Sequence, residues 1–333
     1  MNLSLVICTY MRPKPLVTLL DSIVTQTKKP NEIIIVDGSI NDETKKILND
    51  SNYNLSIKYF LIEKEQRGLT KQRNFGVSKV SEDIEIISFL DDDIILEPNY
   101  FEEISKSFQD NKNAIGVGGI DLKENIYFEI EEDKKYNEAD YFIFDGWVCK
   151  ESARNKIRKK MGLMSSLQPD LIPEFSHGRS ALPPNGKTYK VDHFMGGIAT
   201  YKKDIFNSIT FSTFFEGYGL YEDFDFCVRA SHFGDLLVNT NAKVWHYHAP
   251  SGRPNQFKYG KMVVRNGWYV WRVKYPNPSF KAKLKWHAIT LLLIFIRFFN
   301  IFTTSEKKSA LTESTGRFIA WLLLFVIKPK EKK

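Results

Sequence analysis

The sequence predicts an α/β protein with a doubly wound, mostly parallel sheet and a helical C-terminal appendage. The sheet is predicted by short apolar runs rich in β-branched residues, which alternate with amphipathic segments. A second observation sets the appendage apart, because residues 251–333 carry 17 basic and 3 acidic side chains, whereas residues 1–250 carry 30 and 37. The net charge of +7 therefore comes from the C-terminal quarter, which indicates an anionic partner there.

The predicted elements follow one another along the first part of the chain. The first helix is marked by two prolines, Pro13 and Pro15, and by apolar residues at helical spacing: Leu16, Leu19, Leu20, Ile23 and Val24. The apolar runs predict strands at residues 3–8, 32–36, 57–62, 84–90 and 114–117. Further helices are expected near residues 43–49, 69–80 and 99–108. Strands that alternate with helices are typical of a parallel, doubly wound sheet.

The regular alternation stops near residue 122. Residues 122–190 contain charged stretches and turn residues, and we interpret them as a large insertion over the edge of the sheet. A regular apolar pattern returns at residues 191–201. An acidic and aromatic segment at 206–234 leads into a helix, and residues 236–245 predict a last strand. We therefore expect a domain at residues 1–275, which includes the insertion, and a basic, apolar helical tail at 276–333.

The tail contains two apolar segments, residues 288–302 and 318–327. A helix of about 15 residues is about 22 Å long, shorter than the roughly 30 Å of a hydrocarbon core, so we expect the segments to lie in the membrane interface. Lysines flank the segments as expected for anchors at an anionic leaflet: Lys281, Lys283 and Lys285 before the first, and Lys328, Lys330, Lys332 and Lys333 after the second. The alternative is a pair of helices that complete the core.

The cysteines and the N-terminal residues bear on the compartment. Cys8, Cys149 and Cys227 are widely spaced and form neither a disulfide framework nor a metal-binding pair. The first residues lack the basic region and long apolar stretch of a signal peptide. We therefore expect the catalytic part in the reducing cytosol and the protein at the cytoplasmic face of the membrane, held there peripherally or monotopically.

Asp91, Asp92 and Asp93 are the clearest chemical signal in the sequence, because they follow an apolar strand. In open α/β sheets, ligands bind beyond the carboxyl ends of the strands. Adjacent carboxylates repel one another unless a cation gathers them, and their oxygen atoms favour Mg²⁺ or Mn²⁺. The alternative is an acidic turn exposed to solvent.

Short motifs in order along the chain resemble those of the family 2 glycosyltransferases. They are VICTYMR at 6–12, IVDGS at 35–39, RG at 67–68 with QRNFG at 72–76, the aspartate triplet, GG at 196–197 and ED at 222–223. The resemblance covers about residues 2–275. It implies a GT-A fold, a nucleotide-diphospho-sugar donor, a divalent cation and inversion at the anomeric carbon.

The resemblance also implies roles for single residues. Asp93 would hold the metal, and Asp91 would hold the metal or the ribose. Asp37 would accept a hydrogen bond from the nucleobase, and Arg73 would reach the nucleotide or the diphosphate. The full set expected on the donor side is Thr9, Arg12, Asp37, Arg73, Asp91, Asp92 and Arg253.

Glu222 and Asp223 come just before a buried helix. Acids at a helix start are favoured by the helix dipole, but direct inversion also needs one general base for the acceptor hydroxyl. From the family pattern we expect Asp223 to be that base. On the acceptor side we expect Gly197, Glu222 and Trp245.

His246 and His248 follow the last predicted strand, where the family often supplies a histidine to the metal or the diphosphate. We expect at most one of the two to bind the metal, and we prefer His246, with His248 as the second choice.

Together these features predict an inverting, metal-dependent glycosyltransferase. It would move a sugar to a hydroxyl of a glycan or lipid-linked glycan in cell-surface polysaccharide synthesis. One alternative is a sugar-nucleotide nucleotidyltransferase, but the loop at residues 9–15 lacks the glycines of that class. Another is a noncatalytic, membrane-associated glycan-binding protein. No nucleic-acid partner is expected, because the basic residues of the tail are interleaved with apolar runs.

Overall fold

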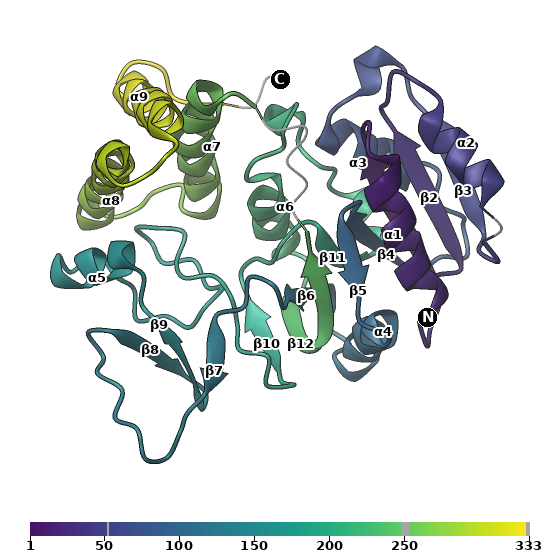
Figure 1. Cartoon of the computed structure of the whole chain (residues 1–333), viewed down its shortest axis with the longest axis horizontal. Helices are drawn as coiled ribbons and strands as arrows, with labels where there is room; N and C mark the ends of the chain where they lie inside the picture. Colours follow the sequence, from purple (N-terminus) through teal and green to yellow (C-terminus); the bar gives the residue numbers. More distant parts are fainter. Residues whose placement is uncertain (52, 248–253, 331–333) are drawn as a thin grey trace. The chain divides into compact units, whose positions relative to one another are not determined.

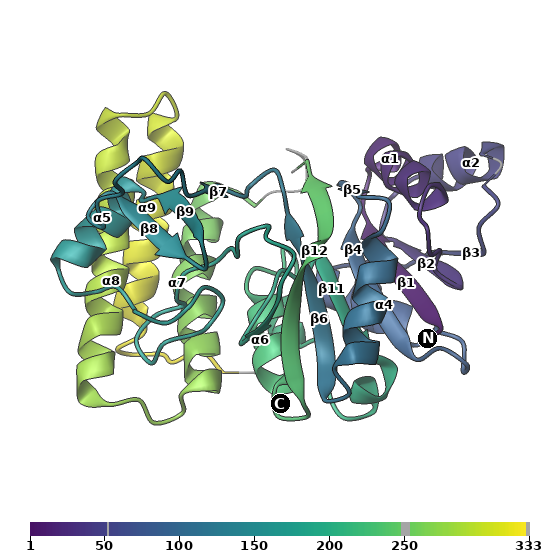
Figure 2. The same cartoon turned by 90° about the horizontal axis from the view of Figure 1, so that it is seen from below.

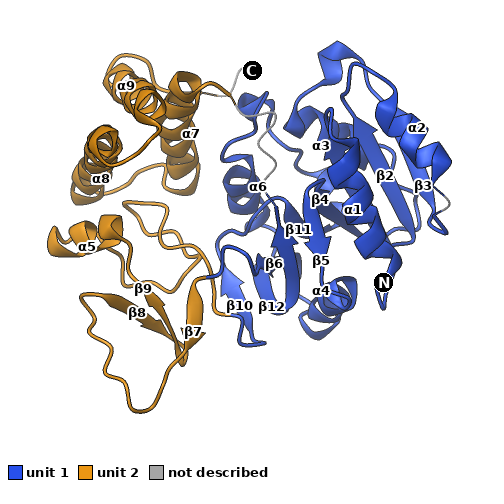
Figure 3. Ribbon diagram, viewed as in Figure 1, with its two compact units in different colours: residues 1–125, 184–252 blue, residues 126–183, 253–333 orange. Residues whose placement is uncertain are grey.

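The computed structural model describes residues 1–51, 53–247 and 254–330. The chain forms two compact units, Met1–Asn125 with Pro184–Gly252, and Ile126–Pro183 with Arg253–Lys333 (Figure 3). We call them unit 1 and unit 2. This grouping joins most of the expected insertion to the C-terminal segment, whereas the sequence suggested a division at residue 275.

Unit 1 contains a mixed, mostly parallel sheet in the order β10-β12-β6-β11-β4-β1-β2-β3, with β5 paired to β12 (Figure 1). Its strands are β1 (Leu3–Thr9), β2 (Glu32–Asp37), β3 (Ile57–Leu61), β4 (Ile86–Asp91), β5 (Ile94–Leu96), β6 (Ala114–Asp121), β10 (Thr188–Val191), β11 (Ile198–Lys202) and β12 (Asp235–His246). Strand β11 runs antiparallel between β4 and β6. The α/β class and the mostly parallel sheet predicted from sequence are confirmed.

The helices of unit 1 alternate with its strands along the chain. They are α1 (Pro13–Val24), α2 (Glu43–Asp50), α3 (Leu69–Val77), α4 (Tyr100–Asp110) and α6 (Glu222–Ala230), with short 3₁₀ turns at Lys64–Gln66, Lys203–Asn207 and Thr213–Phe215. Helix α1 begins with prolines, whose fixed φ suits the first turn. Its residues Leu16, Leu19 and Ile23 are at most 1% exposed and join the core with strand β1.

The register of the parallel strands places the site. Cys8 of β1 pairs with Asp91 of β4, and Thr9 pairs with Asp37 of β2. Strand β12 is parallel to β6, so its C-terminal end also lies at the carboxyl edge of the sheet. At that edge His246 pairs with Ile94 of β5. The ends of β1, β2, β4 and β12 therefore carry their polar residues to one side of the sheet.

Unit 2 is built from a small antiparallel sheet and four helices among its described residues (Figure 2). The elements are β7 (Tyr127–Glu129), β8 (Tyr141–Phe144), β9 (Trp147–Lys150), α5 (Ala153–Lys160), α7 (Gln256–Lys274), α8 (Phe280–Phe299) and α9 (Lys307–Leu323), with a 3₁₀ turn at Asn300–Phe302. Trp271 of α7 stacks on Trp286 of α8, with ring centroids 5.1 Å apart. The three strands were not predicted, because runs of three or four residues give too short a pattern to recognise.

The expected length of the first tail segment was wrong. Helix α8 begins at Phe280 rather than at residue 288, since the hydroxyl of Ser279 caps it by accepting a hydrogen bond from the Ala282 N–H. Its 20 residues span about 30 Å. Within the described residues, Phe280–Phe302 is long and apolar enough by length and composition to cross a membrane, and 22% of its most apolar window is buried. Length therefore gives no reason to exclude a span.

Candidate active site

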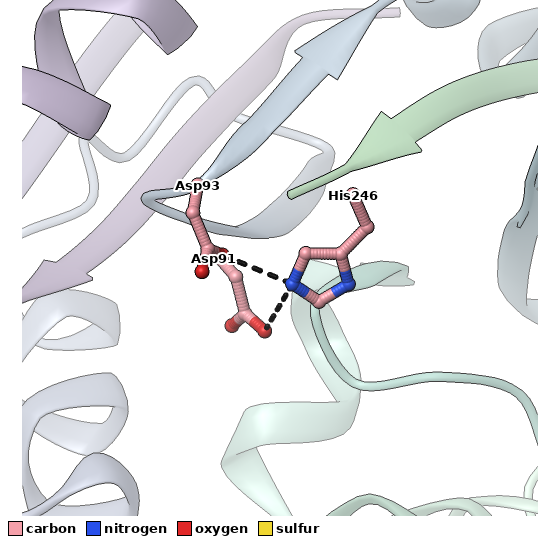
Figure 4. A group of neighbouring side chains, drawn as sticks. All are labelled: Asp91, Asp93 and His246. Carbon is pink, nitrogen blue, oxygen red and sulfur yellow. Dashed lines mark hydrogen bonds and ion pairs between the residues drawn. The ribbon is translucent and has the colours of Figure 1, made fainter. Parts of the chain in front are cut away.

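Asp91, Asp93 and His246 form a cluster at the carboxyl edge of the sheet in unit 1 (Figure 4). Asp91 ends β4, Asp93 lies in the turn to β5, and His246 ends β12. Nε2 of His246 lies 3.0 Å from an Asp93 oxygen and 3.9 Å from an Asp91 oxygen. One ligand atom from each residue lies within 4.8 Å of the others. The backbone fixes this arrangement, because the Tyr247 N–H donates to the Asp93 carbonyl over 3.0 Å.

Asp92 points to different partners from its two neighbours. Its carboxylate accepts hydrogen bonds from the Thr9 hydroxyl at 2.6 Å and from Arg12 Nη1 at 2.9 Å. Burial raises the pKa of Asp92 to about 6, while the charge of Arg12 and the Thr9 hydroxyl oppose the rise. Thr9, Arg12 and Asp92, all expected on the donor side, thus contact one another.

The other two acids differ in exposure. The Asp93 side chain is 7% exposed, and its second oxygen lies 3.4 Å from Arg12. The Asp91 side chain is 36% exposed and is the most accessible of the three. Burial alone would lower the pKa of His246, but the hydrogen bond with Asp93 and the negative charge of Asp91 raise it. The cluster therefore has an excess of negative charge that favours a bound cation.

Arg73 of α3 is buried among the acids. Its guanidinium forms an ion pair with Glu222 of α6, donates to the Gly196 carbonyl at 3.1 Å, and lies 3.6 Å from an Asp91 oxygen. Burial raises the pKa of Glu222, and the charge of Arg73 limits that rise. Arg73 and Glu222 are 3% and 5% exposed, so this pair joins two helices inside the unit.

Gly196 and Gly197 connect this ion pair to the metal-binding candidates. The Gly196 N–H donates to Asp223 at 3.2 Å, and the Gly197 carbonyl accepts from the Asp91 N–H at 3.1 Å. A Cβ atom at Gly197 would lie 2.4 Å from an Asp91 oxygen, so this position has no room for a side chain. Asp223 is half-buried, and burial raises its pKa although two backbone N–H groups oppose the rise.

Asp37 and Trp245 have other partners in the structure. Asp37 is fully buried and accepts from the Ser39 N–H and the Tyr59 hydroxyl, each at 2.8 Å. The indole N–H of Trp245 donates to Glu97 at 2.7 Å. His248 and Arg253, also expected at the site, lie outside the described residues.

Two residues that sequence analysis did not assign also hold the site together. Asp121, at the end of β6, accepts the backbone N–H of His246 at 3.1 Å. Gln72 of α3 donates to the carbonyls of Thr9 and Val36 at 3.2 and 3.0 Å and so joins the ends of β1 and β2. The position of Asp121 directly after an apolar strand could have indicated that it lies near the site. No sequence pattern predicts that Gln72 joins the ends of two strands.

The sheet and its neighbours in known structures define the class of this protein as a GT-A fold. The chain belongs to glycosyl transferase family 2, whose family model matches residues 4–210. The family expected from the motifs is thereby confirmed.

Curated relatives match a limited part of the chain. It is 30% identical over 122 residues to the glucosyl-dolichyl phosphate glucuronosyltransferase of Haloferax volcanii, covering 36% of this chain and 38% of the relative. It is also 30% identical over 124 residues to glycosyltransferase GlyA of Streptococcus pneumoniae serotype 4, covering 36% and 17%. The matched regions therefore span well under half of either relative.

Solved structures resemble a larger part of the chain. The S. aureus TarS structure has a TM-score of 0.50 at 14% identity and covers 97% of this chain and 49% of that one. The structure of GalNAc-T7 with UDP, GalNAc and Mn²⁺ has a TM-score of 0.52 at 16% identity and covers 80% and 49%. At these identities the likeness shows the fold.

Replacing Arg73 with Met tests the buried ion pair. We expect the free energy of unfolding to fall by about 3–5 kcal/mol, because the substitution leaves the Glu222 carboxylate buried without its cation. The double variant Arg73→Met/Glu222→Gln should recover part of that loss. Denaturant unfolding followed by circular dichroism measures both. Lys46→Met, which breaks an exposed pair with Asp42, is the control, and an equal loss in the control and in Arg73→Met would contradict the expectation.

Proposed function

We propose that this protein is an inverting glycosyltransferase that uses a nucleotide-diphospho-sugar donor and a divalent cation. The observation that carries the proposal is the Asp91, Asp93 and His246 cluster at the carboxyl edge of a family 2 chain. Membership of the family favours this function over a nucleotidyltransferase or a noncatalytic glycan-binding protein.

The residues of the cluster suit Mn²⁺ or Mg²⁺. Two carboxylates and one imidazole supply two oxygen ligands and one nitrogen ligand, and the imidazole favours Mn²⁺ of the two. Asp91, Asp93 and His246 would hold the ion. When bound, it would neutralise the negative charge that grows on the leaving diphosphate. The GalNAc-T7 structure contains Mn²⁺ together with UDP and GalNAc, which is consistent with such an ion.

Asp223 would act as the general base. The acceptor oxygen forms a bond to the anomeric carbon, the bond from that carbon to the diphosphate breaks with its electron pair on the diphosphate, and Asp223 takes the hydroxyl proton. Backbone N–H groups of Gly196 and Phe224 hold its two oxygens at 3.2 and 2.9 Å. Glu222 is a poorer candidate, because it is paired with Arg73. We therefore place Glu222 and Gly197 beside the acceptor as supporting residues.

On the donor side, the contacts of each side chain decide its proposed role. Arg12 is partly exposed, so it can approach the donor while it neutralises Asp92. Arg73 is 3% exposed, and we propose that it positions Asp91 rather than reaches the diphosphate. Asp37 would act on the nucleobase side through Ser39, whose backbone N–H it orders.

The acceptor is proposed to be a glycan or a lipid-linked glycan made at the cytoplasmic face of the membrane. The name of the Haloferax volcanii relative, which includes a dolichyl phosphate, supports a lipid-linked acceptor. The basic and apolar C-terminal segment supports the location. Synthesis of a cell-surface polysaccharide fits both features.

Changing Asp93 to Asn tests the metal and donor part of the proposal. We expect at least a 100-fold loss of Mn²⁺ affinity, since changes that only orient a ligand already cost about 10–100-fold. Calorimetry with a panel of nucleotide-diphospho-sugars, with and without Mn²⁺, measures the loss and identifies the donor. Asp235→Asn, at the other end of β12, is the control and should bind like the wild type. Metal-independent binding of every donor would overturn this part.

Changing Asp223 to Asn tests the base. We expect turnover to fall by about 10²–10⁴-fold, because the acceptor proton then has no base, while donor and Mn²⁺ affinities stay close to those of the wild type. Transfer assays with the donor identified by calorimetry measure the change. Retained turnover would refute the role of Asp223, and loss of donor binding would show that the residue acts on the donor instead.

A further inference from the structure

Helix α8 carries an apolar stripe that is interrupted by His287. Five apolar residues of α8 are three, four or seven positions apart and therefore share one face of the helix. They are Phe280, Leu284, Leu291, Phe295 and Phe298. Phe280, Leu284 and Phe295 are 74%, 56% and 52% exposed. Along that face, no charged residue lies between Leu284 and the end of the helix. A stripe of this length is unusual on a surface in contact only with water.

Helix α9 carries a second stripe. Leu311, Phe318 and Leu322 follow the same spacing, Phe325 continues it in the turn after the helix, and all four are exposed. Figure 1 shows α7, α8 and α9 nearly end-on as the corners of a triangle, so α8 and α9 both have a side that points away from α7. The exposed residues of the two stripes therefore lie on the solvent-accessible surface of one helical hairpin, which we call its outer side.

Lysines flank these stripes. At 100° per residue, Lys281 and Lys283 lie on either side of the stripe at the start of α8, and both are exposed. Exposed Lys307 and Lys308 begin α9, and exposed Lys328 follows its end. Residues 276–333 contain 11 basic and 3 acidic side chains. Long lysine stems can lie along an apolar layer while their ammonium groups reach phosphates.

We propose that the outer side of the α8–α9 hairpin lies flat on an anionic phospholipid bilayer, with both stripes in the interface and the lysines on the lipid phosphates. This deepens the proposed membrane location and does not depend on the proposed reaction. The charges favour this surface over a second copy of the chain, because two copies would bring their lysines together.

The packing of α8 within unit 2 favours a flat orientation over a span. The opposite side of α8 contacts the unit through Trp286, which stacks on Trp271, and through Lys285, whose ammonium donates to the Gly162 carbonyl at 2.9 Å. Helix α7, which α8 contacts through this stack of tryptophans, carries Arg265, Arg272 and Lys274. A bilayer crossing would take these charged groups into lipid or strip α8 from its partners. A helix that lies in the membrane interface needs only one apolar side exposed to lipid, as α8 has.

Two sets of variants of the full chain test the orientation. Binding is measured by sedimentation with sucrose-loaded vesicles of phosphatidylcholine, with or without phosphatidylglycerol. The proteins compared are the wild type, Leu284→Glu/Phe295→Glu and Ile143→Glu. Ile143 is 45% exposed on β8 and is the matched control outside the stripes. A thiol-reactive fluorophore at Leu284→Cys, Leu291→Cys or Phe298→Cys, each in a Cys8→Ser background, reports the depth of each position.

We expect binding that requires phosphatidylglycerol, weakens with salt, falls at least about tenfold in the double variant and is unchanged in the control. All three fluorophores should shift to shorter wavelengths on the vesicles. A fluorescence shift at only one end of α8, or vesicle binding that resists salt, would indicate a membrane span and overturn the proposal. Fluorescence shifts that accompany self-association in the absence of lipid would also overturn it. Asp93→Asn should bind vesicles like the wild type, so loss of the proposed reaction and loss of membrane binding are distinguished.

Discussion

Three consecutive carboxylates at the end of a buried strand repel one another, and the structure of unit 1 offsets that repulsion with cations and hydrogen-bond donors from other parts of the chain. Asp92 faces Thr9 and Arg12, Asp93 faces His246, and Asp91 lies near Arg73. Each partner comes from a different element. The positions of β1, β12 and α3 around β4 are therefore tied to the same electrostatic requirement.

The same contacts link the proposed metal site to the proposed base. Arg73 contacts Glu222, Gly196 and Asp91, and the Gly196 N–H holds Asp223. A shift of α6 would therefore disturb both the base and the most exposed acid of the cluster. This connection explains why a buried arginine is useful here although it is not proposed to touch the donor.

The sequence was most informative where one local pattern decides the structure. Strands β1, β2 and β4 are continuous apolar runs, and the aspartate triplet marks the edge to which they lead. The partners of Asp92 were not predictable, because they depend on how the turn at residues 92–93 directs each side chain. The pair of Arg73 with Glu222 joins residues 149 apart, so no local pattern reveals it. Strand β5 and the three strands of unit 2 were too short to recognise, and the start of α8 was hidden by its lysines.

The central claim is that Asp91, Asp93 and His246 gather one divalent cation beside a nucleoside diphosphate. A crystal structure with Mn²⁺ and the diphosphate of the donor nucleotide tests it most directly. Our account predicts an anomalous manganese peak bonded to all three side chains and to phosphate oxygens, with Asp92 still on Thr9 and Arg12. A diphosphate bound at another place, or manganese that leaves these three side chains without contact to it, would contradict the account.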